Sequence, residues 1–215
     1  MKNFESFLRQ ATEVKSPEIC PEIRLNLAAD LATLWADQER WLGRLGLPAP
    51  YWGIAWPGGQ AIARHVLDNP ESFRGAAILD LGAGSGLCAI AAAKAGARRV
   101  HAADIDPFSA LAIEANAGLN DVRVAIVEED LIDRPSRWDV VLAADLWYEK
   151  FLAGRITPWL RRLAQDGTRV LVGDTGRAFL PRAGLTEVGR YAIPTSQSLE
   201  PGAAGAAAVW QLAAA

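Results

Sequence analysis

Three glycines at alternate positions follow a short apolar segment in the first half of the chain. The segment Ile-Leu-Asp-Leu contains Asp80, and the glycines are Gly82, Gly84 and Gly86. Glycine adopts left-handed backbone angles without steric penalty, and it lets the backbone approach a ligand because it has no Cβ. The apolar run that follows predicts a helix, whose first N–H groups would be free to bind an anion. This pattern predicts a nucleotide-cofactor turn between a strand and a helix.

The spacing of the glycines narrows the choice of cofactor. Counted from Gly82, the dinucleotide fingerprint Gly-x-Gly-x-x-Gly needs a glycine at position 87, where this chain has Leu87. Asp-x-Gly-x-Gly-x-Gly is instead the pattern of enzymes that use S-adenosylmethionine, whose methionine part lies beside the glycines. We therefore expect the turn from Asp80 to Gly86, Ala83 included, to bind S-adenosylmethionine. A plain tight turn and a nicotinamide-dependent reductase are the alternatives, and Leu87 disfavours the reductase.

Two further carboxylates lie where predicted strands end. Asp104 is placed to accept hydrogen bonds from both ribose hydroxyls, since Asp106 already provides the cap of the next helix; Ile105 lies between them. Asp130 is placed to accept from the adenine amino group, and Leu131 would offer a backbone N–H and an apolar wall. The alternative for Asp130 is a solvated member of an acidic run. Together these residues predict an adenosine site.

A third carboxylate begins a short aromatic segment. Asp145-Leu146-Trp147-Tyr148 follows an apolar run at 139–144. Parallel strands place such a segment at the edge of the sheet where ligands bind, which favours an active-site role over core packing. Trp56, in the aromatic loop 50–60, could close over the cofactor, with burial against the sheet as its alternative. His65 and His101 lack partners at catalytic or metal-ligand spacing, so we expect both to be structural and no metal site.

Strand and helix patterns alternate along most of the chain. We expect helices at about 27–45, 61–67, 87–95, 107–118 and after 148, where Pro158 could restart or kink the helix. We expect strands at 78–81, 99–104, 122–127, 139–144 and 168–173, with an antiparallel pair at 185–193 and 209–212. The segment 202–208 is expected to be a flexible connection. This alternation predicts a doubly wound, mostly parallel α/β sheet.

Bulk properties limit the possible partners and location. The chain has 215 residues, 51% of them hydrophobic, and a formal net charge of −3. No stretch is long and apolar enough for a membrane span, and the charge gives no reason to expect nucleic-acid binding. Its start lacks an apolar signal core, so we expect a cytoplasmic location. A monomer is the default expectation, and Cys20 and Cys88 imply neither zinc nor a disulfide.

Five segments together resemble a known family. They are PYWGIAWPGGQ (50–60), ILDLGAGSG (78–86), ADIDP (103–107), ADLWYEKFLA (144–153) and TRVLVGDTGR (168–177). They are similar to the seven-β-strand protein-lysine methyltransferases with an Asp-x-x-Tyr motif, and above all to the bacterial form of the electron transfer flavoprotein β-subunit lysine methyltransferases. Asp145 and Tyr148 match that motif.

The resemblance implies a fold, a cofactor and a substrate. It implies a Rossmann-like class I methyltransferase domain at 51–215 with an N-terminal helical extension at 1–50, and a substrate lysine in the flavoprotein β subunit or in a ribosomal stalk protein. It implies cofactor contacts for Trp56, Gly82, Asp104 and Ala144.

The same resemblance places Asp145 and Tyr148 near the target amine. In that arrangement Asp145 would dock and orient the amine, and Tyr148 would be a second hydrogen-bonding partner. Trp147 and Trp56 would offer π faces to cationic groups. A methyltransferase for a small molecule or another protein atom, and a non-enzymatic binding module, remain alternatives.

Overall fold

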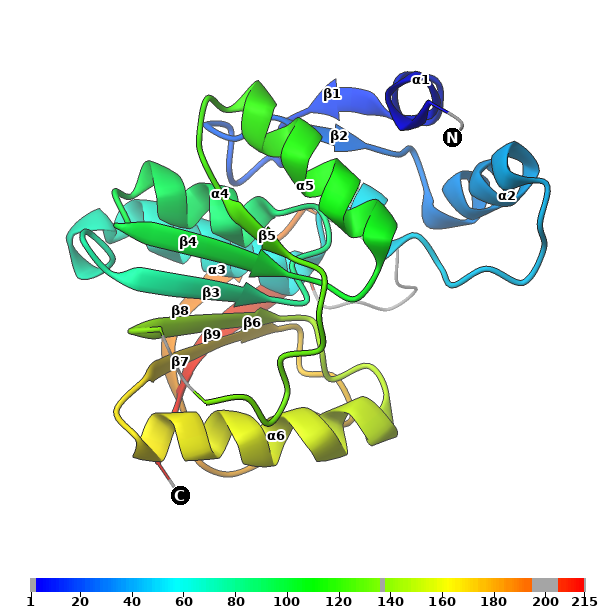
Figure 1. Ribbon diagram of the computed structural model, residues 1–215. Helices are drawn as coiled ribbons and strands as arrows, with labels where there is room; N and C mark the ends of the chain where they lie inside the picture. The colour runs from blue at the N-terminus through cyan, green and yellow to red at the C-terminus, as the bar shows by residue number, and fades with distance from the viewer. Residues whose placement is uncertain (1–2, 136–137, 195–204, 215) are drawn as a thin grey trace.

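The computed structural model of the protein describes residues 3–135, 138–194 and 205–214, which form a seven-stranded sheet with helices on both faces. Figure 1 shows the strands β3 (Ala77–Leu81), β4 (Arg99–Ala103), β5 (Ala125–Val127), β6 (Val140–Ala144), β7 (Arg169–Asp174), β8 (Leu185–Ala192) and β9 (Ala206–Leu212). Their order is β5-β4-β3-β6-β7-β9-β8, and β9 runs antiparallel to both of its neighbours. The predicted α/β fold with an antiparallel last strand is confirmed.

The strand order reverses direction between β3 and β6. From β3 the chain proceeds outward to β4 and β5, whereas β6 returns to the other side of β3 and continues to β7. Strands β3 and β6 are parallel, and Leu81 pairs with Ala143 at their carboxyl ends. In doubly wound sheets such a switch point opens a crevice that binds ligands. The segments that follow β3 and β6 therefore meet at one place.

Side chains of the central strands alternate between two cores. Ile78 belongs to the core beneath the helices α3 and α4, whereas its neighbour Leu79 belongs to the core beneath α6. In Figure 1, α3 (Pro57–Asp68), α4 (Leu87–Lys94) and α5 (Pro107–Leu119) lie on one side of the sheet and α6 (Lys150–Gln165) on the other. Both faces are covered, as the apolar strand sequences predict.

Helix α5 begins as its sequence indicates. Pro107 occupies the first helical position, and the Asp106 carboxylate accepts a hydrogen bond from the N–H of Phe108 at 2.9 Å. Because Asp106 caps this helix, Asp104 is not needed for that purpose.

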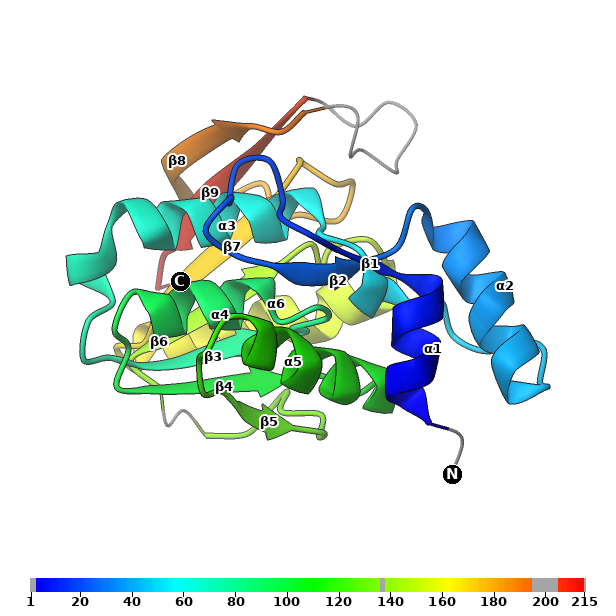
Figure 2. The same ribbon diagram turned by 90° about the horizontal axis from the view of Figure 1, so that it is seen from above.

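The N-terminal segment is not entirely helical. It contains α1 (Phe4–Ala11), a hairpin of β1 (Glu13–Lys15) with β2 (Leu25–Leu27), and α2 (Leu31–Leu42). The helix expected at 27–45 begins only after Asp30, whose side chain caps it, because Leu27 is committed to β2. Figure 2 shows α2 at the periphery of the molecule.

Other boundaries also differ from the predicted ones. Helix α3 begins at Pro57 instead of 61, and β5 is limited to Ala125–Val127. Helix α6 continues through Pro158, since the buried Trp159, Leu160 and Leu163 anchor its second half on the sheet. Strand β9 takes up 206–208 of the stretch expected to be flexible, whereas 202–204 lie outside the described residues. Within the described ranges, no helix is long and apolar enough to cross a membrane.

Candidate active site

A cavity of about 390 Å³ opens at the carboxyl ends of the parallel strands. A second cavity of about 40 Å³ adjoins it and shares several of its lining residues. The predicted site residues that line the larger cavity are Trp56, Gly82, Gly84, Asp104, Ile105, Asp130, Leu131, Ala144, Asp145 and Tyr148. Asp80 and Ala83 line the smaller one. Residues from separate strand ends thus meet at the switch point, and the larger cavity has the size of a small-molecule site.

The glycine turn has the backbone that its sequence predicts. Gly82, Gly84 and Gly86 have φ angles of 64°, 51° and 80°, in the left-handed region. The N–H of Gly84 donates a hydrogen bond of 2.8 Å to the Asp104 carboxylate, which also accepts from the N–H of Asp106 at 3.0 Å. The carboxylate at the end of β4 is therefore fixed against the turn after β3. Burial raises the pKa of Asp104, although these backbone hydrogen bonds oppose the shift.

Asp130 is a paired residue at the cavity wall. Its carboxylate accepts from the Arg155 guanidinium of α6 at 2.8 Å and from the N–H of Ile132 at 3.0 Å. Partial burial raises its pKa, but the hydrogen bonds from Arg155 and Ile132 and the charges of Arg155 and Arg134 together outweigh this, and the pKa lies below its usual value. The buried Leu131 lines the same part of the cavity. The Asp130 side chain is 44% exposed, so the alternative of a solvated member of the acidic run stays open.

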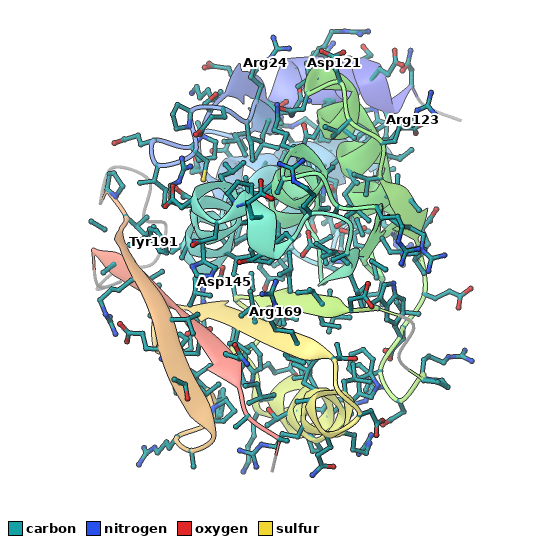
Figure 3. All side chains as sticks on the ribbon, turned by 90° about the vertical axis from the view of Figure 1, so that its left-hand side faces the viewer. Arg24, Asp121, Arg123, Asp145, Arg169 and Tyr191 are labelled. Carbon is teal, nitrogen blue, oxygen red and sulfur yellow. The ribbon has the colours of Figure 1, made fainter. Side chains whose placement is uncertain are left out.

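Asp145 is buried at the end of β6 with both carboxylate oxygens engaged. Its φ is 58°, and its N–H donates to the carbonyl of Gly173 at 2.8 Å. One carboxylate oxygen accepts from the N–H of Gly59 in the first turn of α3 at 2.8 Å, and the other pairs with the Arg177 guanidinium. Burial raises the pKa of Asp145 to about 6, against the opposing charge of Arg177. Figure 3 shows Asp145 well inside the molecule beside the sheet.

Three aromatic side chains line one part of the larger cavity. Tyr51 lies with its ring centroid 5.7 Å from that of Tyr148 and 5.7 Å from that of Trp56. The indole N–H of Trp56 donates to the carbonyl of Tyr51 at 2.9 Å, which fixes the ring. Tyr148 remains 47% exposed, so its hydroxyl is available to a ligand. These rings form an aromatic wall (Tyr51, Trp56 and Tyr148) beside Asp145.

Trp147 lies outside both cavities. Its side chain is fully buried in the core beneath α6, and its indole N–H donates to the Thr157 hydroxyl at 2.9 Å. The prediction that this ring offers a π face to the reacting groups is wrong, because α6 covers it. The sequence pair Trp-Tyr does not indicate which of the two rings points inward.

Asp80 and Gly86 act on the start of α4. Asp80 is buried and accepts a hydrogen bond from the N–H of Ala89, the third residue of α4, at 2.9 Å. This hydrogen bond takes the place of a side-chain N-cap, because the residue at the N-cap position of α4 is Gly86. Burial raises the pKa of Asp80 to about 7. Gly86 lines neither cavity. It adopts the left-handed backbone conformation with which the turn ends.

Sequence reasoning missed several residues of the site, among them Gly58, Gly59, Asp174, Arg177 and Tyr51 of the aromatic wall. A Cβ on Gly58 would lie 2.3 Å from the carbonyl oxygen of Gly173 and 2.7 Å from the Asp145 carboxylate, so only glycine fits there. Asp174 is the last residue of β7 and pairs with Arg177, which follows the strand and reaches Asp145. The available signals were the Pro-Gly-Gly run at 57–59 and the charged pair within Gly-Asp-Thr-Gly-Arg at 173–177.

The remaining predicted residues are consistent with structural roles. His65 lies 3.2 Å from the Tyr191 hydroxyl, and His101 accepts from the Trp138 indole N–H at 2.9 Å. Among the described residues, no cluster of three or more His, Cys, Asp or Glu side chains could hold a metal ion. Cys88 is buried in α4, as its small-residue surroundings predict.

Comparison with known proteins places the chain in a family. The family model described as Ribosomal protein L11 methyltransferase (PrmA) matches residues 64–171. The electron transfer flavoprotein beta subunit lysine methyltransferase of Xenopus laevis is 43% identical over 80% of this chain and 70% of the relative. The protein of the same name from Danio rerio is 38% identical over 97% of this chain and 83% of the relative.

A solved structure supports the fold independently. The magnesium protoporphyrin IX methyltransferase from Synechocystis PCC 6803, determined with bound S-adenosylmethionine, superposes with a TM-score of 0.53 at 16% identity, over 82% of each chain. The relatives and the family model show that the chain belongs to the family of electron transfer flavoprotein β-subunit lysine methyltransferases, within the PrmA-like methyltransferases.

Proposed function

We propose that this protein transfers a methyl group from S-adenosylmethionine to the side-chain amine of a lysine in the electron transfer flavoprotein β subunit. The observation that carries the proposal is the Asp145 carboxylate, which lies in one cavity with the aromatic wall and the glycine turn. The relatives that match most of the chain are named for this reaction. The match to the PrmA family supports a ribosomal stalk protein as a second substrate to be tested.

The lining of the larger cavity supports S-adenosylmethionine as its ligand. A Cβ on Gly82 would lie 2.6 Å from the Leu146 side chain, so this position needs glycine, and the Asp104 carboxylate lies across the turn. In this fit Asp104 binds the ribose, Asp130 and Leu131 bind the adenine, and the turn from Gly82 to Gly84 holds the methionine part. When bound, the cofactor supplies a methyl group on a positively charged sulfur.

The chain's own residues position the acceptor amine. A free lysine has a pKa of about 10.4, so it arrives as an ammonium ion. The ionised Asp145 attracts that ammonium, and the Tyr148 hydroxyl gives a second hydrogen bond that fixes its direction. The amine would lose one proton to water, and its nitrogen would then attack the methyl carbon in line, with the carbon–sulfur bond breaking and S-adenosylhomocysteine leaving. Most of the rate enhancement then comes from alignment and from the exclusion of water.

The test is methylation of the purified flavoprotein. The protein is incubated with S-adenosylmethionine and the recombinant β subunit, and the product is analysed by tandem mass spectrometry. We expect increments of about 14 Da, the mass of a CH₂ group, on lysine, with equimolar S-adenosylhomocysteine formed. The Asp145→Asn variant is the negative control.

Three outcomes would contradict the proposal. If the stalk protein is methylated and the flavoprotein is not, the stalk protein is the substrate and the flavoprotein is not. If neither protein is modified while small amines are methylated, the enzyme belongs with small-molecule methyltransferases. If the protein binds the cofactor but transfers a methyl group to no acceptor, it is a non-enzymatic binding module.

A further inference from the structure

A chain of three charged side chains extends from the end of β7 to Asp145. The carboxylate of Asp174 accepts from the N–H groups of Gly176 and Arg177, both at 2.7 Å, and this turns the backbone back toward the sheet. Nη1 of the Arg177 guanidinium lies 3.3 Å from the other Asp174 oxygen, and the same nitrogen pairs with Asp145. Arg177 is thus held between two carboxylates.

The three charges are almost completely removed from water. The side chains of Asp145, Arg177 and Asp174 are 7%, 9% and 0% exposed. Burying such groups carries a large desolvation penalty, so a buried ion pair is weak evidence for a stabilising role. Asp145 and Arg177 line the cavity of the proposed methyl transfer. The arrangement therefore calls for an explanation in terms of that cavity.

The formal charges suit a cationic ligand. Two carboxylates and one guanidinium leave one negative charge, which an incoming ammonium ion can neutralise. An isolated Asp145–Arg177 pair would be neutral and would offer no net attraction. Asp174 restores the negative charge and also holds the guanidinium in place. A single guanidinium nitrogen, Nη1, contacts both carboxylates.

We propose that Arg177, anchored by Asp174, is a positioning residue for methyl transfer that fixes the orientation and the ionised state of the Asp145 carboxylate. The inference rests on the proposed function, since it assigns Asp145 to the acceptor amine. Arg177 touches Asp145 and acts through it.

The surroundings of Asp145 give this inference a signature in pH dependence. Arg177 lowers the pKa of Asp145, whereas Asp174 raises it. The N–H of Gly59 at the start of α3 also favours the ionised carboxylate. Asp80 of β3 and Cys88 of α4 line the small cavity beside Asp145, and Tyr148 lies in the larger one. Removing Arg177 and removing the charge of Asp174 therefore shift the titration of Asp145 in opposite directions.

The first experiment measures kcat/KM against pH for wild type, Arg177→Gln and Asp174→Asn. We expect Arg177→Gln to lose roughly 30-fold in kcat/KM near pH 7, since hydrogen bonds between charged groups are of that strength. Its acid limb moves to higher pH, so the loss shrinks as the pH is raised. The acid limb of Asp174→Asn moves to lower pH, because asparagine keeps the backbone contacts without the charge. Cofactor affinity stays within about twofold in both, as neither side chain belongs to the adenosine site.

Two further variants separate positioning from folding. Arg64 of α3 is 19% exposed and pairs with Glu22 and Asp68, both at 2.9 Å, outside either cavity. Arg64→Gln loses a comparable ion-pair network and is expected to keep the wild-type pH profile. Arg177→Lys keeps the positive charge and is expected to recover part of the activity. If Arg177→Gln does not fold, the activity and pH profile of Arg177→Lys are compared with those of wild type instead.

The second experiment titrates Asp145 directly, with no substrate. The carboxyl carbon of Asp145 is followed by NMR in selectively labelled protein and assigned by its absence in Asp145→Asn. We expect a higher midpoint in Arg177→Gln and a lower one in Asp174→Asn. Failure of the proposed function would appear as a wild-type enzyme that does not methylate the flavoprotein, and the titration would still decide the present inference. Equal midpoints in all three proteins, or unchanged kcat/KM in Arg177→Gln with an active wild type, would overturn it.

Discussion

Asp80, near the carboxyl end of β3, and Asp145, directly after the neighbouring strand β6, are two buried carboxylates with different partners. Each is buried and accepts a hydrogen bond from the third N–H of a helix, Ala89 of α4 for Asp80 and Gly59 of α3 for Asp145. Asp145 also pairs with Arg177, whereas no cation within the described part of the chain pairs with Asp80. A carboxyl group that only caps a helix can do so when neutral, but one that binds an ammonium must be ionised.

The same difference separates the two halves of the cavity. On the proposed cofactor side, Asp104 is fixed by the N–H of Asp106, two residues further on, and by the N–H of Gly84 in the turn after the neighbouring strand β3. On the proposed acceptor side, Asp145 is fixed by Gly59 and Arg177, which come from before β3 and after β7. The first side thus joins two adjacent strand ends, whereas the second is assembled from three distant parts of the chain.

The difference between Asp145 and Asp80 is tested most directly by the matched variants Asp145→Asn and Asp80→Asn. We expect Asp145→Asn to reduce kcat/KM by about 100-fold or more, because the buried Arg177 and the acceptor ammonium both lose their counter-charge. Asp80→Asn keeps an acceptor for Ala89, so its activity should remain within about fivefold of wild type. Steady-state kinetics would measure both, with calorimetry for the cofactor. Equal losses in the two variants would remove the distinction between them.

Gly58→Ala tests the close approach of α3 to the acceptor side. The new Cβ would meet the Gly173 carbonyl and the Asp145 carboxylate, so α3 must shift. We expect a loss of about 1–3 kcal/mol in the free energy of unfolding, together with reduced activity. Gly118→Ala is the control, since this helical glycine of α5 has nothing within 4 Å of the added Cβ. Chemical denaturation compares the two variants, and a stable, fully active Gly58→Ala would refute the constraint.

Asp104→Asn tests the proposed cofactor side of the cavity. Loss of the charged acceptor at the ribose should weaken S-adenosylmethionine binding by about tenfold, the effect of one charge-assisted hydrogen bond. The rate at saturating cofactor should change much less, because Asp104 does not contact the amine. Calorimetric titration with S-adenosylhomocysteine measures the affinity. An unchanged dissociation constant would remove Asp104 from the ribose site.

The smallest effect is expected for Trp147→Phe. Phenylalanine keeps most of the apolar contact beneath α6 but loses the hydrogen bond to Thr157, so the protein should be destabilised by about 1 kcal/mol. Activity should stay close to wild type, in contrast to Tyr148→Phe, which removes a hydroxyl at the cavity. A large loss of kcat in a stably folded Trp147→Phe would return this residue to the active site.

The sequence was most informative where function depends on local order along the chain. The glycine turn, Asp104 and Asp145 each follow a recognisable strand, and the alternation of strands and helices predicts the edge of the sheet where they meet. Arg177 could not be identified in this way, because its contact with Asp145 spans 32 residues and forms only when β6 and β7 pair. Gly58 escaped for the same reason, since the backbone that excludes a Cβ belongs to β7.

The N-terminal segment shows a different limit. The apolar spacing at 27–45 predicts a helix, but Leu27 joins β2 because the hairpin with β1 satisfies its backbone. Strands of three residues carry too little alternation to be recognised in a single sequence. Trp147 and Tyr148 show the corresponding limit for side chains, since adjacent aromatics point to opposite sides and only the packing of α6 decides which is buried.

The most direct test of the account is a crystal structure of the protein with S-adenosylhomocysteine. We predict that the ribose hydroxyls bind the Asp104 carboxylate, that the amino acid part lies along Gly82–Gly84, and that the sulfur faces Asp145 and Tyr148. A ligand bound outside this cavity, or a sulfur directed away from the Asp145 carboxylate, would contradict it.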